Sequence, residues 1–103
     1  MNIILKNKLK SIKALCRQYK VKSLYSFGSI NTNRFDPAKS DIDLLLEFDP
    51  GITIEEYTDN FFALHEQLTN LFSKKIDLVT KRSLSNPFFI NEVEQTKQLL
   101  YGA

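Results

Sequence analysis

Apolar residues recur at helical spacing in two stretches of the chain. The first set predicts a helix over residues 3–19 with one apolar face, made of Leu5, Leu9, Ile12, Cys16 and Tyr19. A second, longer helix is predicted over residues 54–72. Thr53 and Glu56 form the capping-box pattern that starts such a helix, and its inward positions are Tyr57, Phe61, Leu64, Leu68, Leu71 and Phe72.

Three short stretches have the composition of β-strands. Residues 21–27 are rich in β-branched and aromatic side chains. Residues 41–48 contain the apolar run Leu44-Leu45-Leu46 and end before Asp49-Pro50-Gly51, and residues 75–80 form a third β-like run. Residues 31–40 are polar, and we expect a connector there with one helical turn after Ser29. Asn86-Pro87 is typical of a helix start. The helix that follows is expected to carry three inward-facing residues, Ile90, Val93 and Leu100.

The order of these elements predicts an α/β (α+β) fold around a small mixed three-stranded sheet. A helix joins the second and third strands, so these two are expected to run parallel through a right-handed crossover. The first strand must run antiparallel to the second to bring its C-terminal end to the start of that strand. We expect the opposite face of the sheet to be polar, because the helices pack on the face that carries Ile42, Leu44, Ile76 and Leu78.

Composition limits the classes of protein to consider. The chain has 103 residues, 43% hydrophobic and 25% charged, as in an ordinary folded protein, and we expect one domain over residues 1–103. No apolar run reaches the roughly 18–20 residues of a membrane span, and residues 1–5 lack the pattern of a signal peptide, so we expect a cytoplasmic protein with no membrane partner. Cys16 is predicted to pack as a buried, reduced thiol.

Charge is distributed unevenly along the chain. The first 22 residues contain seven Lys and Arg residues and no acid, whereas the remainder contains seven basic and twelve acidic residues. Such a segment can bind nucleic acid or an acidic protein surface, or it can be a solvated helix face. The solvated face is favoured, because no aromatic residues alternate with the lysines in a way suited to base stacking.

Three aspartates are candidate metal ligands. Asp41 and Asp43 begin the second predicted strand, and because side chains alternate along a strand both project from one face. Parallel pairing of the third strand sets Asp77 beside them. Carboxylates are ligands that Mg²⁺ prefers, and two such ions can hold the attacking and leaving oxygens of a phosphoryl transfer. All three aspartates are therefore predicted as catalytic residues that bind two Mg²⁺ ions.

Gly28 and Ser29 follow the first strand and are candidate phosphate ligands. Glycine permits close approach of the backbone, and Ser29, at the start of a helical turn, offers N–H groups and a hydroxyl to phosphate oxygens. A phosphate-binding turn next to carboxylate metal ligands indicates function more strongly than either motif alone.

Together these motifs resemble the minimal nucleotidyltransferases of the DNA polymerase β-like superfamily. The similar blocks occur in the family's order over most of the chain, and they are Phe27-Gly28-Ser29, Ser40-Asp41-Ile42-Asp43-Leu44-Leu45, Lys75-Ile76-Asp77-Leu78-Val79-Thr80 and Leu99-Leu100-Tyr101-Gly102. The resemblance implies the polymerase β-like nucleotidyltransferase fold and transfer of AMP from ATP to a hydroxyl, with release of pyrophosphate.

The resemblance also implies a role for each site residue. Asp41 and Asp43 would hold both metals, and Asp77 would bind the catalytic one and help to deprotonate the attacking hydroxyl. Gly28 and Ser29 would hold the triphosphate.

The chain departs from the family pattern in its positive charges. Members often have Arg soon after Gly-Ser, whereas here Ile30 follows and the first basic residue is Arg34. We predict Arg34 as a nucleotide-binding residue, because a triphosphate needs positive charge beyond its metals. Lys39 in the connector, or Lys81 and Arg82 after the third strand, could take the same role.

Small members of the family resemble the antitoxins of toxin–antitoxin pairs, whose partner is a HEPN ribonuclease adenylylated on a tyrosine. The resemblance thus implies an antitoxin that modifies such a toxin. Two alternatives stay open: an antitoxin without catalytic activity that neutralises its partner by binding, and a nucleotidyltransferase that acts on RNA or a small molecule. An exposed subset of Phe62, Phe88 and Phe89 could contribute apolar surface to a partner interface, although core packing is favoured for each of them.

Overall fold

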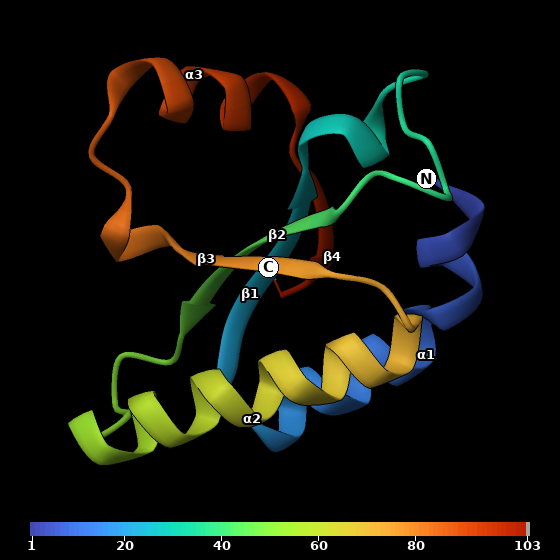
Figure 1. The fold of residues 1–103 in the computed structure, drawn as a ribbon. Helices are drawn as coiled ribbons and strands as arrows, with labels where there is room; N and C mark the ends of the chain where they lie inside the picture. The colour runs from blue at the N-terminus through green and yellow to red at the C-terminus, as the bar shows by residue number, and fades with distance from the viewer. Residues whose placement is uncertain (103) are drawn as a thin grey trace.

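The computed structural model describes residues 1–102 (Figure 1). Its elements are α1 (Ile3–Gln18), β1 (Val21–Phe27), the 3₁₀ turn η1 (Gly28–Asn31), β2 (Ile42–Phe48), α2 (Ile54–Phe72), β3 (Ile76–Thr80), the 3₁₀ turn η2 (Lys81–Ser83), α3 (Pro87–Thr96) and β4 (Gln98–Tyr101). The first two helices and the first three strands lie within one residue of their predicted bounds. None of the helices in this part of the chain has the length and apolar character that crossing a membrane requires.

The four strands form one mixed sheet in the order β3-β2-β1-β4. β1 pairs antiparallel with β2, and β2 pairs parallel with β3, which confirms the predicted directions. The predicted count of three strands is wrong. The sequence places Leu100 on the last helix, whereas α3 ends at Thr96 and β4 pairs antiparallel with β1. Leu100 lies about two helical turns after Val93, so its apolar side chain fits either element.

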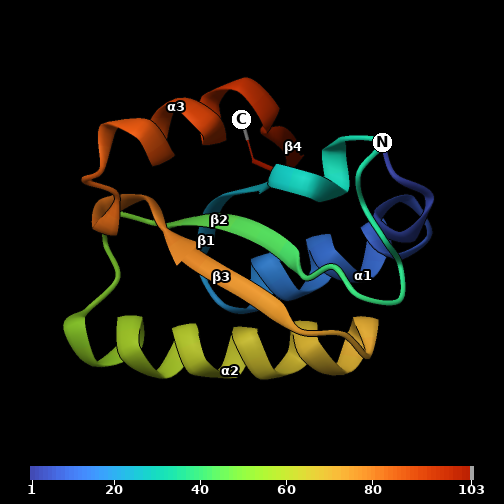
Figure 2. The ribbon, with the colours of Figure 1, turned by 45° about the horizontal axis from the view of Figure 1, so that its top comes forward.

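Helices cover both faces of the sheet. α1 and α2 lie on one face, and α3 lies over the other (Figure 2). The α3 face holds a small apolar cluster of Phe27, Leu45 and Val93, and the Phe27 and Phe89 rings meet edge to face at 5.7 Å. The prediction that all helices pack on one face is therefore wrong for α3. The physical reason is that Leu45 and Val79 add apolar surface to the face of the aspartates, and that surface is buried by a helix.

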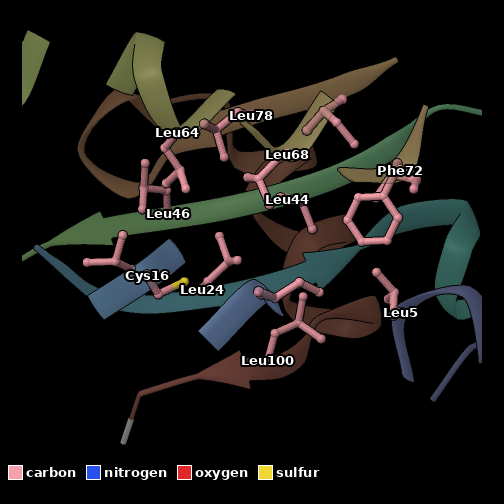
Figure 3. Packing of buried hydrophobic residues seen from close by; sticks show 14 of the residues in the cluster. Leu5, Cys16, Leu24, Leu44, Leu46, Leu64, Leu68, Phe72, Leu78 and Leu100 are labelled. Carbon is pink, nitrogen blue, oxygen red and sulfur yellow. The ribbon is translucent and has the colours of Figure 1, made fainter. Parts of the chain in front are cut away.

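The main core lies between the sheet and the layer of α1 and α2. β2 contributes Ile42, Leu44 and Leu46, all fully buried, and Figure 3 shows Leu64 and Leu68 of α2 beside this strand. Burial of this kind contributes on the order of 2 kcal/mol per large side chain to folding. The core thus forms on the face that strand alternation predicts, and the α+β class is confirmed.

Cys16 faces the same core from α1. It is fully buried with a free thiol, as predicted. Burial raises its pKa to about 12, and the nearby Arg17 guanidinium offsets only part of that rise. The thiol therefore stays protonated at neutral pH and acts as a packing residue.

Two helix starts match their sequence signals. At α2, Thr53 Oγ1 accepts the Glu56 N–H at 3.1 Å and Glu56 Oε1 accepts the Thr53 N–H at 3.2 Å, which completes the capping box. At α3, Asn86 Oδ1 accepts the N–H groups of Phe88 and Phe89. These caps set where both helices begin relative to the sheet.

Candidate active site

The acidic part of the sheet lies where β2 and β3 start and β1 ends. Asp43 is opposite Asp77 in the parallel β2–β3 register and opposite Phe27 in the antiparallel β1–β2 register. Residues opposite one another in a sheet share a face, so the two carboxylates project on the same side. Gly28 follows Phe27 directly and begins η1 there. Three segments that are distant in sequence therefore meet at this point, as the topology requires.

Asp43 is a strongly perturbed carboxyl group. Its side chain is half-buried, and burial, followed by the charges of Asp77, Asp41 and Glu92, raises its pKa to about 6. All four groups carry negative charge when ionised, so repulsion from the other three disfavours the ionised form of Asp43. Such a cluster favours a nearby cation, because a bound divalent ion would relieve both the repulsion and the cost of burial.

Asp41 lies one residue before β2 and is only partly covered. Lys75 Nζ stands 3.6 Å from Asp41 Oδ2, and both side chains are exposed, so this ion pair contributes little to stability. Within residues 1–102, no group of three or more His, Cys, Asp or Glu side chains is placed so that it could hold a metal ion as it stands. The donor type and the repulsion at Asp43 fit a hard divalent cation, and Asp41 would have to turn from Lys75 to join the set.

Gly28 brings the backbone against the Asp43 carboxylate. Its φ of 72° lies in the left-handed region, and a Cβ atom at this position would stand 2.6 Å from Asp43 Oδ2. Any larger residue would therefore displace the carboxylate. The group that the Gly28 backbone approaches is the Asp43 carboxylate, and its predicted role in holding a phosphate stays a prediction.

Ser29 lies in η1, directly after Gly28. Its carbonyl oxygen accepts the N–H and the hydroxyl of Thr32, each at 2.9 Å, which closes the turn. The Gly28 N–H donates to Thr96 Oγ1 at 2.8 Å. The first N–H groups of a helical turn have no partner within it, so the Ser29 N–H and hydroxyl are the candidate donors to an anion here, whereas Ile30 is buried in the core.

The candidate positive charges lie at two ends of the sheet. Arg34 and Lys39 are exposed in the connector between η1 and β2, which leads into the aspartates. Lys81 and Arg82 follow β3 at its other end, where the Arg82 guanidinium lies 5.1 Å from the centre of the Tyr57 ring. Position along the strands therefore favours the connector residues as neighbours of the aspartates.

A cavity of about 680 Å³ also lies at the end of the sheet away from the aspartates. Phe48, Tyr57 and Arg82 are among its lining residues, and none of the three aspartates lines it. The acid site is instead an open part of the sheet face, since Asp77 is exposed. Cavity size is thus a poor guide to this site, and the strand register is a better one.

The mixed sheet carries carboxylates at the starts of two paired strands, and a turn that begins with glycine lies beside them. This arrangement defines a small α+β protein of the nucleotidyl-transfer class. A family model described as "Nucleotidyltransferase domain" matches residues 9–100. The chain therefore belongs to this family, which confirms the resemblance in the sequence, and it is an enzyme of the nucleotidyltransferase kind.

Relatives and solved structures agree with this assignment. A Methanocaldococcus jannaschii protein named as a candidate protein adenylyltransferase is 40% identical over 83 residues, which cover 81% of this chain and 80% of the relative. A structure described as a candidate minimal nucleotidyltransferase superposes with a TM-score of 0.66 at 24% identity, over 91% of this chain and 90% of that chain.

A third similar protein comes from a complex. A chain in the structure of a tri-AMPylated Shewanella oneidensis HEPN toxin with an MNT antitoxin superposes with a TM-score of 0.65 at 22% identity, over 95% of this chain and 72% of that chain. At these identities the two solved structures establish a shared fold.

Sequence reasoning missed four residues near the site: Lys75 and Glu92, which act on the aspartates, Thr96, which bonds to Gly28, and Asn31, which donates to the Thr96 carbonyl oxygen at 2.8 Å. Lys75 could have been found, because the parallel register pairs Ile42 with Ile76 and so sets the preceding residues, Asp41 and Lys75, side by side. Glu92 and Thr96 lie one turn apart on α3 and reach the site only because that helix crosses the acidic face. No local motif marks either of them.

Proposed function

We propose that this nucleotidyltransferase transfers AMP from ATP to a tyrosine hydroxyl of a HEPN-type toxin protein and thereby acts as its antitoxin. The observation that carries the proposal is the meeting of Gly28, Asp43 and Asp77, which supports a role for this turn in binding phosphate beside the carboxylates. The acceptor oxygen forms a bond to the α-phosphorus, the bond from that phosphorus to the bridging oxygen breaks, and pyrophosphate leaves. Asp77 takes the proton of the hydroxyl.

We assign Mg²⁺ as the cofactor, with Asp41 and Asp43 as ligands of two ions and Asp77 as a ligand of one. When bound, the ions would neutralise charge on the transferred phosphoryl group. Gly28 and Ser29 bind the triphosphate, and Arg34 adds positive charge from the connector. Repulsion at Asp43 supports the metal assignment, because a cation removes it.

The protein acceptor is supported by the names of similar proteins and by exposed apolar residues. The M. jannaschii relative is named for protein adenylyl transfer, and the S. oneidensis complex pairs an MNT antitoxin with an AMPylated HEPN toxin. Phe88 is 87% exposed and Phe62 is 65% exposed, which suits contact with another protein, whereas Phe89 packs on Phe27. ATP and such a toxin would meet in the cytoplasm, where we place this single-domain protein of residues 1–103.

Intact mass spectrometry tests the proposal. The protein is incubated with ATP, Mg²⁺ and the product of the reading frame adjacent to its gene, in parallel with an Asp41→Asn, Asp43→Asn double variant. Glu47→Gln is the matched control, since Glu47 lies on the same strand face as Asp43 but at the far end of β2. We expect the partner to gain the mass of one or more AMP groups with the wild type and the control, and none with the double variant.

The outcomes separate the parts of the proposal. Fragmentation of the modified partner shows whether the acceptor is a tyrosine. If no form adds mass but all still bind and neutralise the partner, the enzymatic proposal fails and neutralisation by binding replaces it. AMP found on RNA in place of protein would overturn the acceptor and leave the transfer chemistry standing.

A further inference from the structure

Thr96, the last residue of α3, is hydrogen-bonded to the turn η1 that begins with Gly28. Figures 1 and 2 both show the end of this helix beside η1. Thr96 Oγ1 accepts the Gly28 N–H at 2.8 Å and donates to the Glu92 carbonyl oxygen at 2.9 Å. A hydroxyl has one proton, and the bond to Glu92 uses it, so the oxygen faces Gly28 as an acceptor only. Thr96 therefore restrains one N–H group of the turn in both distance and direction.

Asn31 ties the same two segments together at a second point. Its Nδ2 atom donates to the Thr96 carbonyl oxygen at 2.8 Å and to the Ser26 carbonyl oxygen at 3.1 Å. The Ser26 side chain is fully buried, and its hydroxyl donates to Asn31 Oδ1 at 3.2 Å. Within residues 1–102 no buried side-chain polar atom lacks a partner, so this network is complete. The turn is thus held from β1 and from α3.

This network acts where the backbone meets the acid site. Gly28 lies against the Asp43 carboxylate, and Ser29 follows it directly with an N–H group and a hydroxyl. Glycine has the most conformational freedom of any residue, so Gly28 cannot hold this position by itself. A shift of about 1 Å in the turn would change both the reach of the Ser29 donors and the space around Asp43, and shifts of that size can cost ~100-fold in rate.

We propose that Thr96 is a positioning residue for nucleotide transfer. Its hydroxyl holds Gly28 so that the Gly28–Ser29 turn keeps its place beside Asp43 and binds the triphosphate there. The inference rests on the proposed function, which assigns this turn to the triphosphate of ATP. It adds a residue that lies 68 positions after Gly28 and belongs to none of the sequence motifs.

Steady-state kinetics of three variants test this role. Thr96→Val keeps the shape of the side chain and removes the acceptor, whereas Thr96→Ser keeps the acceptor. Thr69→Val is the matched control, because Thr69 donates to the His65 carbonyl oxygen at 2.8 Å within α2, as Thr96 does to Glu92 within α3. We expect Thr96→Val to raise KM for ATP about tenfold, the weight of one hydrogen bond, without changing KM for the acceptor. The other two variants should stay within about twofold of wild type.

A merely structural role for Thr96 predicts a different pattern. Loss of correctly folded protein would lower kcat in Thr96→Val and leave both KM values unchanged, and that result would overturn the proposal. An equal rise of KM for ATP in Thr69→Val would overturn it as well, because that variant loses the same bond within a helix without touching Gly28.

Amide hydrogen exchange, measured by NMR without ATP, separates this inference from the proposed function. The Gly28 N–H is expected to exchange at least about tenfold faster in Thr96→Val than in wild type and to stay within about threefold in Thr96→Ser. Unchanged exchange at Gly28 would overturn the proposal whatever the activity. If exchange at Gly28 is faster in Thr96→Val but the wild type neither binds ATP nor transfers AMP, the proposed function and the role of Thr96 in transfer both fail. Only the hydrogen bond between Thr96 and Gly28 would then be established.

Discussion

The two faces of β2 have different roles, one in packing the core and the other in the candidate active site. Ile42, Leu44 and Leu46 project toward α1 and α2 and are fully buried in the main core, whereas Asp43 and Leu45 project toward α3. Alternation along a single strand therefore puts packing on one side and the candidate chemistry on the other. Position 43 shows the consequence most clearly, since its immediate neighbours in the chain are both core residues.

The difference between the faces is also electrostatic. The α1–α2 face is apolar, and burial there favours folding. On the α3 face, burial and neighbouring carboxylates oppose the ionised form of Asp43. Stability gained on one face thus offsets repulsion on the other, and each face can be perturbed separately.

The largest expected effect is a loss of activity from the acidic face. Asp77→Asn should reduce AMP transfer on the order of 1,000-fold, about 4 kcal/mol in the barrier, because an amide neither attracts a cation strongly nor takes a proton. Its free energy of unfolding should stay within about 0.5 kcal/mol of wild type, since Asp77 is exposed. Transfer of labelled AMP to the partner measures the rate. A comparable loss in Glu47→Gln would mean that the face acts only through its net charge.

Loss of stability from the apolar face comes next. Leu44→Ala should lower the free energy of unfolding by about 4 kcal/mol and Leu45→Ala by about 2 kcal/mol, because Leu44 is enclosed by the main core and Leu45 by the smaller cluster under α3. Urea denaturation followed by circular dichroism measures both values. Equal losses in the two variants would contradict the unequal contribution of the faces.

A smaller effect is expected at the turn that begins with Gly28, where a substitution should affect both stability and activity. Gly28→Ala should cost about 2 kcal/mol in stability, because an alanine is strained at a φ of 72°, and it should also reduce AMP transfer by displacing the Asp43 carboxylate. Gly51→Ala is the control, since nothing lies within 4 Å of a Cβ atom at that position. Thermal unfolding and transfer assays of both variants measure the effect. Full activity in Gly28→Ala would show that the close approach is not needed.

The smallest expected effect is a gain in stability on removal of the Asp43 charge. The pKa of Asp43 is raised from 3.8 to about 6, so the folded state binds its proton more tightly than the unfolded chain does. The contribution of this group to wild-type stability is therefore present below about pH 4 and is lost as the pH rises through about 6. Asp43→Asn lacks this titration. The free energy of unfolding of the variant minus that of wild type should therefore be about 1 kcal/mol larger at pH 8 than at pH 4, a value reduced for solvent screening because the group is half-exposed.

Urea denaturation in EDTA at the two pH values measures that difference. Added Mg²⁺ at pH 8 should narrow the gap, because a ligand that binds the folded wild type stabilises it and the amide has lost a ligand atom for the ion. An advantage that does not change with pH would contradict the raised pKa.

Most of the fold follows from local patterns, and the exceptions depend on contacts across the chain. α2 has its predicted bounds because the capping box and the apolar spacing agree. β4 is not predicted, because its four residues become a strand only by pairing with β1, and Leu100 also fits a helix. The cover that α3 gives to the acidic face likewise depends on Leu45 meeting Val93, which no local pattern encodes.

The candidate site divides in the same way. Gly28, Asp41 and Asp43 stand in short motifs, and the rule for parallel crossovers is enough to bring Asp77 beside Asp43. Thr96 has no motif, and its hydroxyl gains meaning only from the hydrogen bond to Gly28. Positions that act through a long-range bond are therefore the ones that a single sequence conceals.

Cys16 makes the molecule unusually convenient for attaching probes. With its thiol buried and its pKa raised to about 12, we expect it to react with maleimides at neutral pH far more slowly than an exposed cysteine does. Ser85→Cys, at an exposed position just before α3, would introduce a single reactive thiol. A dye or spin label placed there could follow the approach of a partner to α3 in a background that needs no prior removal of native cysteines.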